Sequence, residues 1–420
     1  RPADVKGPIL PEPRNEIDPT KTWEGLFGPT GNGISMDDVP LVDDFKKGVY
    51  VWKSQERIPQ GKYPGGDLSG LSGGFASPTV WDGDVFLYYY VPSGDVYDFL
   101  WTGKGNKPHK WLIHADDVII RIDGQTGRTV WKKSFKEMGM NWTLERKAGP
   151  AVSNVVYDGI VYAVGTTGNV YAVDAETGET VWISDIGKRA TELKNQKATA
   201  LETERLVKFQ LDFMGNPIVA GDVLVVHGFT RGLSPLVAFD LKTGAKRWTS
   251  APAIAATEGT PAKWVHNGKE YVISGTQAMS RLIDPADGST VWELRGDVPG
   301  YQFPVVHGDY LVTQKLQRAD NGAVAGRKVG VYKISLEGLE EVWVNHTFPY
   351  QFPVVYNDAV YIGGDERNDL VVADLHTGKQ IGILKGTENL NKDDFWSFLI
   401  ADNKLFTRAN DDVKDTVNFL

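Results

Sequence analysis

Cysteine is absent from this sequence, and its absence removes several classes of function. Without thiols the chain has no disulfide, no thiolate metal site, no c-type haem attachment and no cysteine nucleophile. It also lacks a run of 18 apolar residues, so we expect no membrane span. A net charge of -9 would repel a phosphate backbone, so we expect no nucleic-acid partner. No P-loop, G-x-S-x-G or H-E-x-x-H motif occurs.

Glycine and tryptophan are plentiful instead, with 46 and 13 residues in a chain of 420. Frequent glycine with many aromatic side chains is typical of short strands, tight turns and large side chains between sheets. Five prolines fall within the first 20 residues, and we expect residues 1–47 to form an extended N-terminal arm. Because residue 1 is Arg, we expect a longer precursor with a signal peptide.

A repeated unit predicts the architecture. The clearest copy runs from Ser153 to Trp182 and reads as four short strands with Gly-containing turns between alternating Val and Tyr residues. The same unit recurs along the chain, with its first turn at Asp82, Asp158, Gly221, Asn267, Gly308, Asn357 and Asp402. These turns lie 41 to 76 residues apart, and the shorter spacings match one four-stranded blade. We therefore predict an all-β fold, a single β-propeller over residues 48–420 with seven blades, or eight if a degenerate blade is hidden.

The two longest spacings predict insertions at about 92–113 and 186–210, the second with a short helix. The last unit stops before a fourth strand, whereas residues 48–54 (G-V-Y-V-W-K-S) look like a fourth strand without its first three. Pairing the two chain ends would complete one four-stranded antiparallel blade and remove open sheet edges. We expect the N-terminal strand to close the propeller in this way.

The segment D-x-x-T-G-x-x-x-W ends most of these units. It occurs at Asp123–Trp131, Asp174–Trp182 and Asp240–Trp248, and with Asp287 in place of Thr at Asp284–Trp292. The fifth unit keeps only Trp343. The sixth keeps Asp374, Thr377 and Gly378, with Ile383 near the Trp position. This pattern resembles the tryptophan-docking repeat of PQQ-like β-propellers, a family that includes quinoprotein dehydrogenases and the assembly lipoprotein BamB.

The resemblance implies a bacterial periplasmic or extracellular protein, because the residues from Trp23 to Ser35 look like the entry segment of exported PQQ-like proteins. It also raises the question of a quinone cofactor with Ca²⁺. No set of Asp, Glu and Asn can be assigned to the cofactor ligands residue by residue, and the adjacent Cys pair of the alcohol-oxidising enzymes is absent. We therefore expect no cofactor and no metal, and we read the Trp, Thr-Gly and Asp residues as structural.

Function in a propeller concentrates where the innermost strands begin. The repeat places Ser77, Ser153, Asn216, Thr260, Phe303, Phe352 and Ser397 at equivalent positions there. The candidate ligand-binding residues lie just before them: Phe75, Tyr301, Gln302, Tyr350, Gln351 and Trp396. Such side chains suit stacking on, and hydrogen bonding to, a sugar or a peptide, although they could equally plug a narrow channel.

Catalysis has three candidates, His227, Arg231 and Tyr301. As a group they could abstract a proton beside a uronate carboxylate while the arginine neutralises that carboxylate. Nothing in the sequence shows that they meet. The first hypothesis is an exported, non-catalytic scaffold that binds a protein or glycan at one face. The second is a carbohydrate-active enzyme of the polysaccharide lyase type, and the third is a PQQ-dependent oxidoreductase.

Overall fold

The structure is a computed structural model of the whole chain. It describes residues 21–37, 39–42, 48–56, 76–100, 108–140, 152–165, 167–186, 215–228, 235–251, 260–276, 279–295, 301–320, 324–347, 353–363, 370–384 and 398–406. Contacts divide the chain into two compact units. The first unit combines Arg1–Leu26 with Tyr50–Pro252, and the second combines Phe27–Val49 with Ala253–Leu420. Each unit is described by itself.

The first unit holds three four-stranded sheets, each antiparallel with its strands in chain order. The first sheet comprises β1 (Thr79–Trp81), β2 (Asp84–Leu100), β3 (Pro108–Ile122) and β4 (Thr129–Met140). The second comprises β5 (Val155–Tyr157), β6 (Ile160–Val164), β7 (Asn169–Asp174) and β8 (Thr180–Asp185). The third comprises β9 (Ile218–Ala220), β10 (Val223–His227), β11 (Leu236–Asp240) and β12 (Lys246–Thr249).

The second unit holds three more four-stranded sheets and one two-stranded sheet. Its first sheet comprises β13 (Ala262–His266), β14 (Lys269–Thr276), β15 (Met279–Ile283) and β16 (Thr290–Arg295). Next come β17 (Tyr301–His307), β18 (Tyr310–Arg318), β19 (Val324–Ile334) and β20 (Leu339–Thr347). The remaining strands are β21 (Val354–Tyr356), β22 (Ala359–Ile362), β23 (Leu370–Asp374) and β24 (Gln380–Leu384), then β25 (Leu399–Ala401) and β26 (Lys404–Phe406).

Every named element of the described residues is thus a strand, as the repeat predicts. The described residues form six four-stranded sheets, whereas the number of blades in the complete chain stays a prediction. No helix in the described part is long and apolar enough to cross a membrane.

The first turns of the repeat form where the sequence places them. Asp82 and Gly83 both have positive φ values, 47° and 81°, and join β1 to β2; Asp158 and Gly159 do the same between β5 and β6. Two central residues with positive φ define the type I′ turn, whose twist matches that of paired strands. Asp and Gly tolerate this conformation, which fixes the register of each first hairpin.

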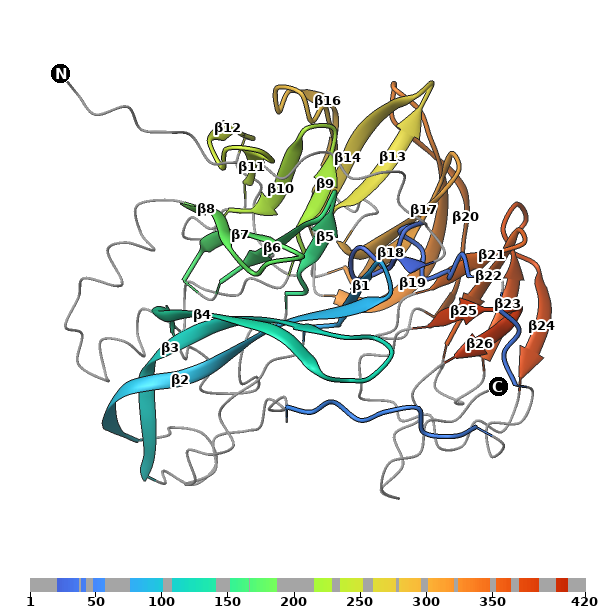
Figure 1. Cartoon of the computed structure of the whole chain (residues 1–420). Coiled ribbons are helices and arrows are strands. Elements are labelled where there is room, and N and C mark those ends of the chain that lie inside the picture. Colours follow the sequence, from blue (N-terminus) through green and yellow to red (C-terminus); the bar gives the residue numbers. More distant parts are fainter. Residues whose placement is uncertain are drawn as a thin grey trace. The chain divides into compact units, whose positions relative to one another are not determined.

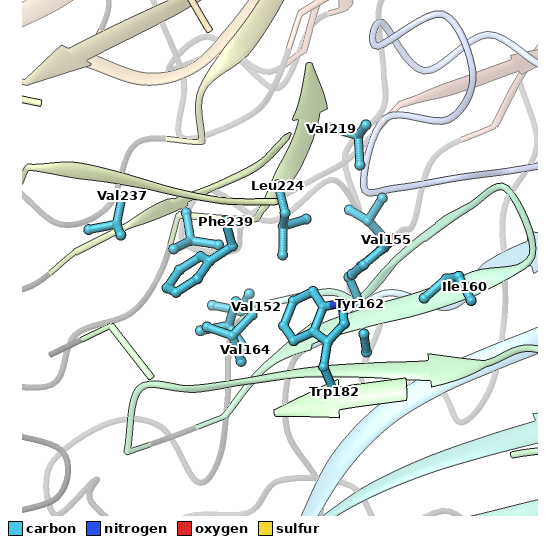
Figure 2. Packing of buried hydrophobic residues seen from close by; sticks show 13 residues of the cluster. Val152, Val155, Ile160, Tyr162, Val164, Trp182, Val219, Leu224, Val237 and Phe239 are labelled. Carbon is cyan, nitrogen blue, oxygen red and sulfur yellow. The ribbon is translucent and has the colours of Figure 1, made fainter. Parts of the chain in front are cut away.

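Apolar side chains fill the space between consecutive sheets. In the first unit, residues of the second sheet such as Tyr162 and Trp182 share one cluster with Leu224 and Phe239 of the third. Figure 2 shows these side chains pointing toward one another from the two sheets. Because both faces of an inner strand are covered, β6 and β7 are buried at every position.

The repeated tryptophans lie over the hairpin of the following sheet. In the first unit the Trp182 indole N–H donates to the Leu241 carbonyl oxygen at 2.9 Å. A Cβ atom added to Gly244 would lie 2.6 Å from the Trp182 ring, so only glycine allows this approach. Trp131 makes the same contact one sheet earlier, with its indole N–H donating to the Ala175 carbonyl oxygen at 3.0 Å.

The second unit repeats the arrangement. Trp343 donates to the Leu375 carbonyl oxygen at 2.7 Å and lies against Gly378. Trp292 donates to the Ser335 carbonyl oxygen at 2.9 Å, even though the hairpin that it meets has lost the Asp-x-x-Thr-Gly residues. The contact therefore depends on the indole and a main-chain carbonyl more than on the full motif.

Trp52 is a further member of this series. Its indole N–H donates to the Gly124 carbonyl oxygen at 2.7 Å, and the ring lies against Gly127. The Gln55 amide also donates to the Gly127 carbonyl oxygen at 2.8 Å. Trp52 thus occupies on the first sheet the place that Trp131 occupies on the second, which supports the prediction that residues 48–54 stand for a fourth strand.

The N-terminal part of the chain also joins the last described sheet, at a residue that precedes 48–54. Ile34 forms a parallel bridge with Ile400 of β25. Residues 48–54 form no strand, and Tyr50 is 97% exposed. The residues after 406 lie outside the described part, so the pairing of 48–54 with the C-terminal strands stays a prediction.

The sixth unit needs a correction at its tryptophan position. The register pairs Gly382 with Val372 just as it pairs Trp182 with Ala172, so Gly382 replaces the tryptophan. Ile383, which the sequence placed near this position, is one residue further along and 40% exposed. The spacing in the sequence agrees with the register, because Gly382 follows Asp374 at the distance at which Trp182 follows Asp174, and both ladders carry the same bulge.

The predicted insertion at 92–113 is largely a continuation of one hairpin. The β2–β3 ladder runs on through Val96↔Leu112 to Leu100↔Pro108, and Figure 1 shows the two strands as one long hairpin. The other insertion, at 186–210, lies outside the described residues beyond 186, and its helix stays a prediction.

The hairpin aspartates predict a loss of stability in acid. The Thr126 hydroxyl donates to Asp123 at 2.7 Å and holds the pKa of that carboxyl below its ordinary 3.8; Thr377 does the same for Asp374. A carboxyl with a lower pKa in the folded state stabilises the fold above its unfolded pKa, and this contribution is lost as the pH falls through the folded pKa.

We therefore expect the free energy of unfolding to decrease below about pH 4. The double variant Asp123→Asn/Asp374→Asn should lose less stability than the unmodified chain between about pH 5 and pH 2.5. Urea unfolding at several pH values measures this slope. Equal slopes for the two proteins would show that these carboxyls do not titrate differently on folding.

Candidate functional site at the entry ends of the first strands

The entry end of a sheet is the end at which its first strand begins. In the first unit, β1 and β5 begin just after two residues that the repeat makes equivalent, Ser77 and Ser153. The Ser77 amide donates to the Ser153 hydroxyl oxygen at 2.9 Å, and the Ser153 amide donates to Asn216 Oδ1 at 2.6 Å. These bonds confirm that the predicted positions of the first unit lie next to one another in series.

A second polar contact follows on the same strands. The Asn154 side-chain amide donates to the Thr79 hydroxyl oxygen, and both side chains are fully buried. A buried polar group needs a partner, and the Asn154 nitrogen and the Thr79 hydroxyl supply one to each other across the two sheets. The polar side chains at these entry ends therefore tie the sheets of the first unit to one another.

Part of the predicted N-terminal arm lies along the first strands of the first unit. Trp23 forms an antiparallel bridge with Val80 of β1, with amide–carbonyl distances of 2.7 and 2.9 Å. The Lys21 carbonyl oxygen accepts from Gly83, and the Glu24 carbonyl oxygen accepts from Val156 of β5. The outer main-chain groups of β1 and β5 are thus partly occupied by the chain itself.

Residues 33–35 form similar main-chain hydrogen bonds with the last described sheet, in the second unit. The Gly33 carbonyl oxygen accepts from Ile400 at 2.9 Å, and the Ser35 amide donates to the Ile400 carbonyl oxygen at 2.8 Å. Gly33 has φ 79°, and a Cβ there would lie 2.8 Å from the Phe398 carbonyl oxygen and 3.2 Å from Val354. The glycine therefore meets two needs at once, a left-handed backbone and a close approach to β25.

The described part of the chain does not test whether the three candidate catalytic residues meet. His227 is the last residue of β10, in the first unit, and its side chain is 5% exposed. Tyr301 is the first residue of β17, in the second unit, with its backbone opposite Gln314. Arg231 lies outside the described residues. Their catalytic grouping stays a prediction.

The described part of the chain does not test the candidate ligand-binding residues as a site. The backbone of Tyr301 and Gln302 lies at the start of β17, as an entry-end position requires. Four others lie outside the described residues, namely Phe75, Tyr350, Gln351 and Trp396.

One buried acid escaped the sequence analysis. Asp117 of β3 is fully buried and accepts hydrogen bonds from Tyr88 at 2.8 Å and from Tyr171 of the next sheet at 2.7 Å. Burial, with the nearby Asp117 charge as a second cause, raises the pKa of Tyr171 well above its ordinary value of 10.0. The tyrosine therefore stays protonated and keeps donating. In the sequence Asp117 is one of two adjacent aspartates within a strand, and nothing in that pattern shows that it is buried between two tyrosines.

The Asp117 contact yields a stability prediction. Tyr171→Phe removes one donor from a buried carboxylate and should lower the free energy of unfolding by about 1–3 kcal/mol. Tyr162→Phe is the matched control, since that hydroxyl donates only to a neutral carbonyl at 3.2 Å and should cost about 1 kcal/mol or less. Chemical denaturation measures both. A Tyr171→Phe protein as stable as the unmodified chain would show that Asp117 does not depend on this bond.

Comparisons with known proteins agree on the fold. Residues 115–381 match the sequence model of a family described as outer membrane protein assembly factor BamB. No curated protein sequence matches the chain. The solved quinohemoprotein alcohol dehydrogenase from Comamonas testosteroni is similar, with 12% identity, a TM-score of 0.50, and coverage of 94% of this chain and 77% of that one.

Two further solved structures are similar at lower scores. BamB from Moraxella catarrhalis has 16% identity and a TM-score of 0.45 over 71% of this chain and 79% of that one. A europium-containing methanol dehydrogenase has 10% identity and a TM-score of 0.41 over 93% and 89%. At these identities a likeness speaks to the fold alone, and the fold is that of a β-propeller.

Proposed function

Because the chain belongs to the PQQ-like β-propeller family described as outer membrane protein assembly factor BamB, we propose that it is an exported, non-catalytic scaffold that binds a protein partner. The partner meets the entry ends of the sheets, where the predicted aromatic residues precede the first strands. A glycan in place of a protein is one outcome of the test. The proposal places the protein in the bacterial periplasm or outside the cell.

One observation carries this proposal. At the entry ends of the first unit, the buried side chains of Ser153 and Asn216 accept hydrogen bonds from main-chain amides next to the preceding first strand, those of Ser77 and Ser153 respectively. A catalytic centre needs polar groups that converge on a substrate. Here the side chains of Ser153 and Asn216 bond to a neighbouring sheet, which suits a surface that binds without reacting.

A quinone cofactor with a metal ion is the alternative that the dehydrogenase fold suggests. Within the described ranges, no three His, Asp or Glu side chains form a group that could hold a metal ion. The buried Asp117 carboxylate is already bonded to two tyrosines. The described residues therefore do not fit such a centre, and the proposal includes no step through it.

Site-specific photo-cross-linking in the producing cell tests the proposal. A photoreactive amino acid replaces Tyr301 at the entry end of the β17–β20 sheet. The control position is Glu337, an exposed residue in the turn between β19 and β20 at the opposite end of that sheet. We expect one discrete protein adduct from position 301 and none from 337. Adducts at 337 alone, or a glycan adduct at 301, would overturn the protein-binding assignment.

A further inference from the structure

The fourth strand of each four-stranded sheet is an edge strand, and β24 differs from the other five in its charge. Within the described residues these strands, β4, β8, β12, β16, β20 and β24, each pair on one side only. Charged side chains on an edge strand keep strands of other molecules from adding to it. Five of the six carry such side chains, among them Lys132, Asp185, Arg247, Glu293 and Glu341. The β24 strand, Gln-Ile-Gly-Ile-Leu, carries none.

The β24 strand also exposes more apolar surface than the other fourth strands. Ile381 is 59% exposed and Ile383 is 40% exposed. Among the described residues the other fourth strands expose at most one large apolar side chain each, namely Val130 on β4, Ile183 on β8 and Val291 on β16. All six ladders carry a bulge at the same place, so the bulge does not set β24 apart. Its uncharged, apolar edge does.

Gly382 lies between the two isoleucines, and the fold of its own sheet does not require a glycine there. Its φ is not in the left-handed region. A Cβ atom would lie 3.4 and 3.6 Å from side-chain atoms of Val372, which are ordinary contact distances. The other five sheets hold a tryptophan at this position, namely Trp131, Trp182, Trp248, Trp292 and Trp343. A glycine inside a strand weakens it and often marks a place where another backbone approaches closely.

The order of the side chains makes β24 complementary to itself. In an antiparallel pair of two copies centred on Gly382, each Gly382 lies opposite its counterpart, and Ile381 of each copy lies opposite Ile383 of the other. Directly opposite residues in such a pair have Cβ atoms about 4.5–5.5 Å apart, so the isoleucines form two cross-strand apolar pairs. Because the strand is uncharged, no like charges meet across the two-fold axis. One edge per copy then limits the assembly to a dimer.

We propose that the β24 edge is a self-association surface, to which a second copy of this chain adds its own β24 antiparallel and centred on Gly382. A contact between two five-residue strands buries little area, so the dimer is weak and forms at high protein concentration. The net charge of -9 on each copy opposes their approach, and added salt strengthens the dimer by screening this repulsion. This inference is independent of the proposed function.

Sedimentation equilibrium at increasing protein concentration tests the surface. We expect a monomer–dimer equilibrium that shifts toward the dimer as salt rises from about 20 mM to about 300 mM. Ile381→Lys/Ile383→Lys should abolish the dimer. Val130→Lys/Ile183→Lys, the same change at exposed positions of β4 and β8, should leave it unchanged. A dimer that persists in the first variant, or species larger than a dimer, would overturn the proposal.

Single cysteines report the register, because the chain has no cysteine of its own. Opposite residues of an antiparallel pair have Cα atoms about 4.5–5.5 Å apart, a distance that a disulfide spans. With an added oxidant, Gly382→Cys should form a disulfide-linked dimer and Ile183→Cys should not. A mixture of Ile381→Cys and Ile383→Cys proteins should cross-link more than either protein alone. A Gly382→Cys protein that stays monomeric would contradict the pairing. An unmodified chain that stays monomeric but binds an Ile-Val peptide at this edge would overturn the second copy as the occupant.

Discussion

Replacing Trp182 with alanine is expected to lower the free energy of unfolding by about 3–5 kcal/mol, because the indole is 7% exposed and its removal leaves a cavity between two sheets. The lost hydrogen bond to the Leu241 carbonyl adds to the effect. Urea denaturation of the variant measures it. Ile183→Ala, on the same strand at 44% exposure, is the control and should change stability by less than about 1 kcal/mol.

A double-mutant cycle shows whether the tryptophan acts through the hairpin of the next sheet. Gly244→Ala alone should be destabilising, since the new Cβ would lie 2.6 Å from the indole. In the Trp182→Ala background the clash disappears, and only the cost of a positive φ, 68° here, remains. Additive effects of the two substitutions would mean that the ring and the glycine do not interact.

The second large effect is expected at the N-terminal segment. Gly33→Ala should lower the free energy of unfolding for two reasons. Its positive φ costs about 1–2 kcal/mol for a residue with a Cβ. Crowding of that Cβ against Phe398 and Val354 costs about 1–3 kcal/mol more. Gly31→Ala is the matched control, because its φ is 68° and no atom lies within 4 Å of the added Cβ. The difference between the two isolates the packing of this segment on β25.

Hydrogen exchange provides the local readout for the same pair. The amides of Ser35 and Ile400, which bond across the bridge, should exchange faster in Gly33→Ala than in Gly31→Ala. Equal exchange rates and equal stabilities would show that the segment does not depend on its close contact with β25.

The sheets and their junctions were largely predictable from the sequence, for a physical reason. A tryptophan that packs on the next sheet needs a glycine beneath it and a turn that presents a carbonyl, so the requirement recurs as Asp-x-x-Thr-Gly with a downstream Trp. Trp182 and Gly244 illustrate it, since each is identifiable from its place in a repeat. Gly382 shows the limit, because the repeat places it at the tryptophan position although it has no indole to dock.

The N-terminal segment was not predictable in this way. Trp23 and Ile34 hold their strands through main-chain hydrogen bonds, which leave no periodic pattern of side chains. The prolines that precede the segment indicate an extended arm, yet they do not say what the arm contacts. Glycines at 28, 31 and 33, all with positive φ, were the available signal, because they occur together where no repeat requires them.

The candidate site was partly predictable. The alignment of repeats placed Ser77 and Ser153 at the entry ends, and their hydrogen bond confirms the placement. Asp117 and Gln314 were missed, because each sits within a strand pattern where polar residues ordinarily face solvent. Only the packing of the adjoining sheets shows that these two side chains are fully buried.

The central claim is that this propeller serves as a non-catalytic scaffold, in which Ser153 and Asn216 at the entry ends bond to neighbouring sheets. Its most direct test is the melting temperature of the purified chain with increasing PQQ and Ca²⁺, since a ligand that binds only the folded state must raise it in proportion to the logarithm of its concentration. We predict no change at any concentration. A melting temperature that climbs steadily with added PQQ would show that the fold holds the cofactor, and the scaffold account would be wrong.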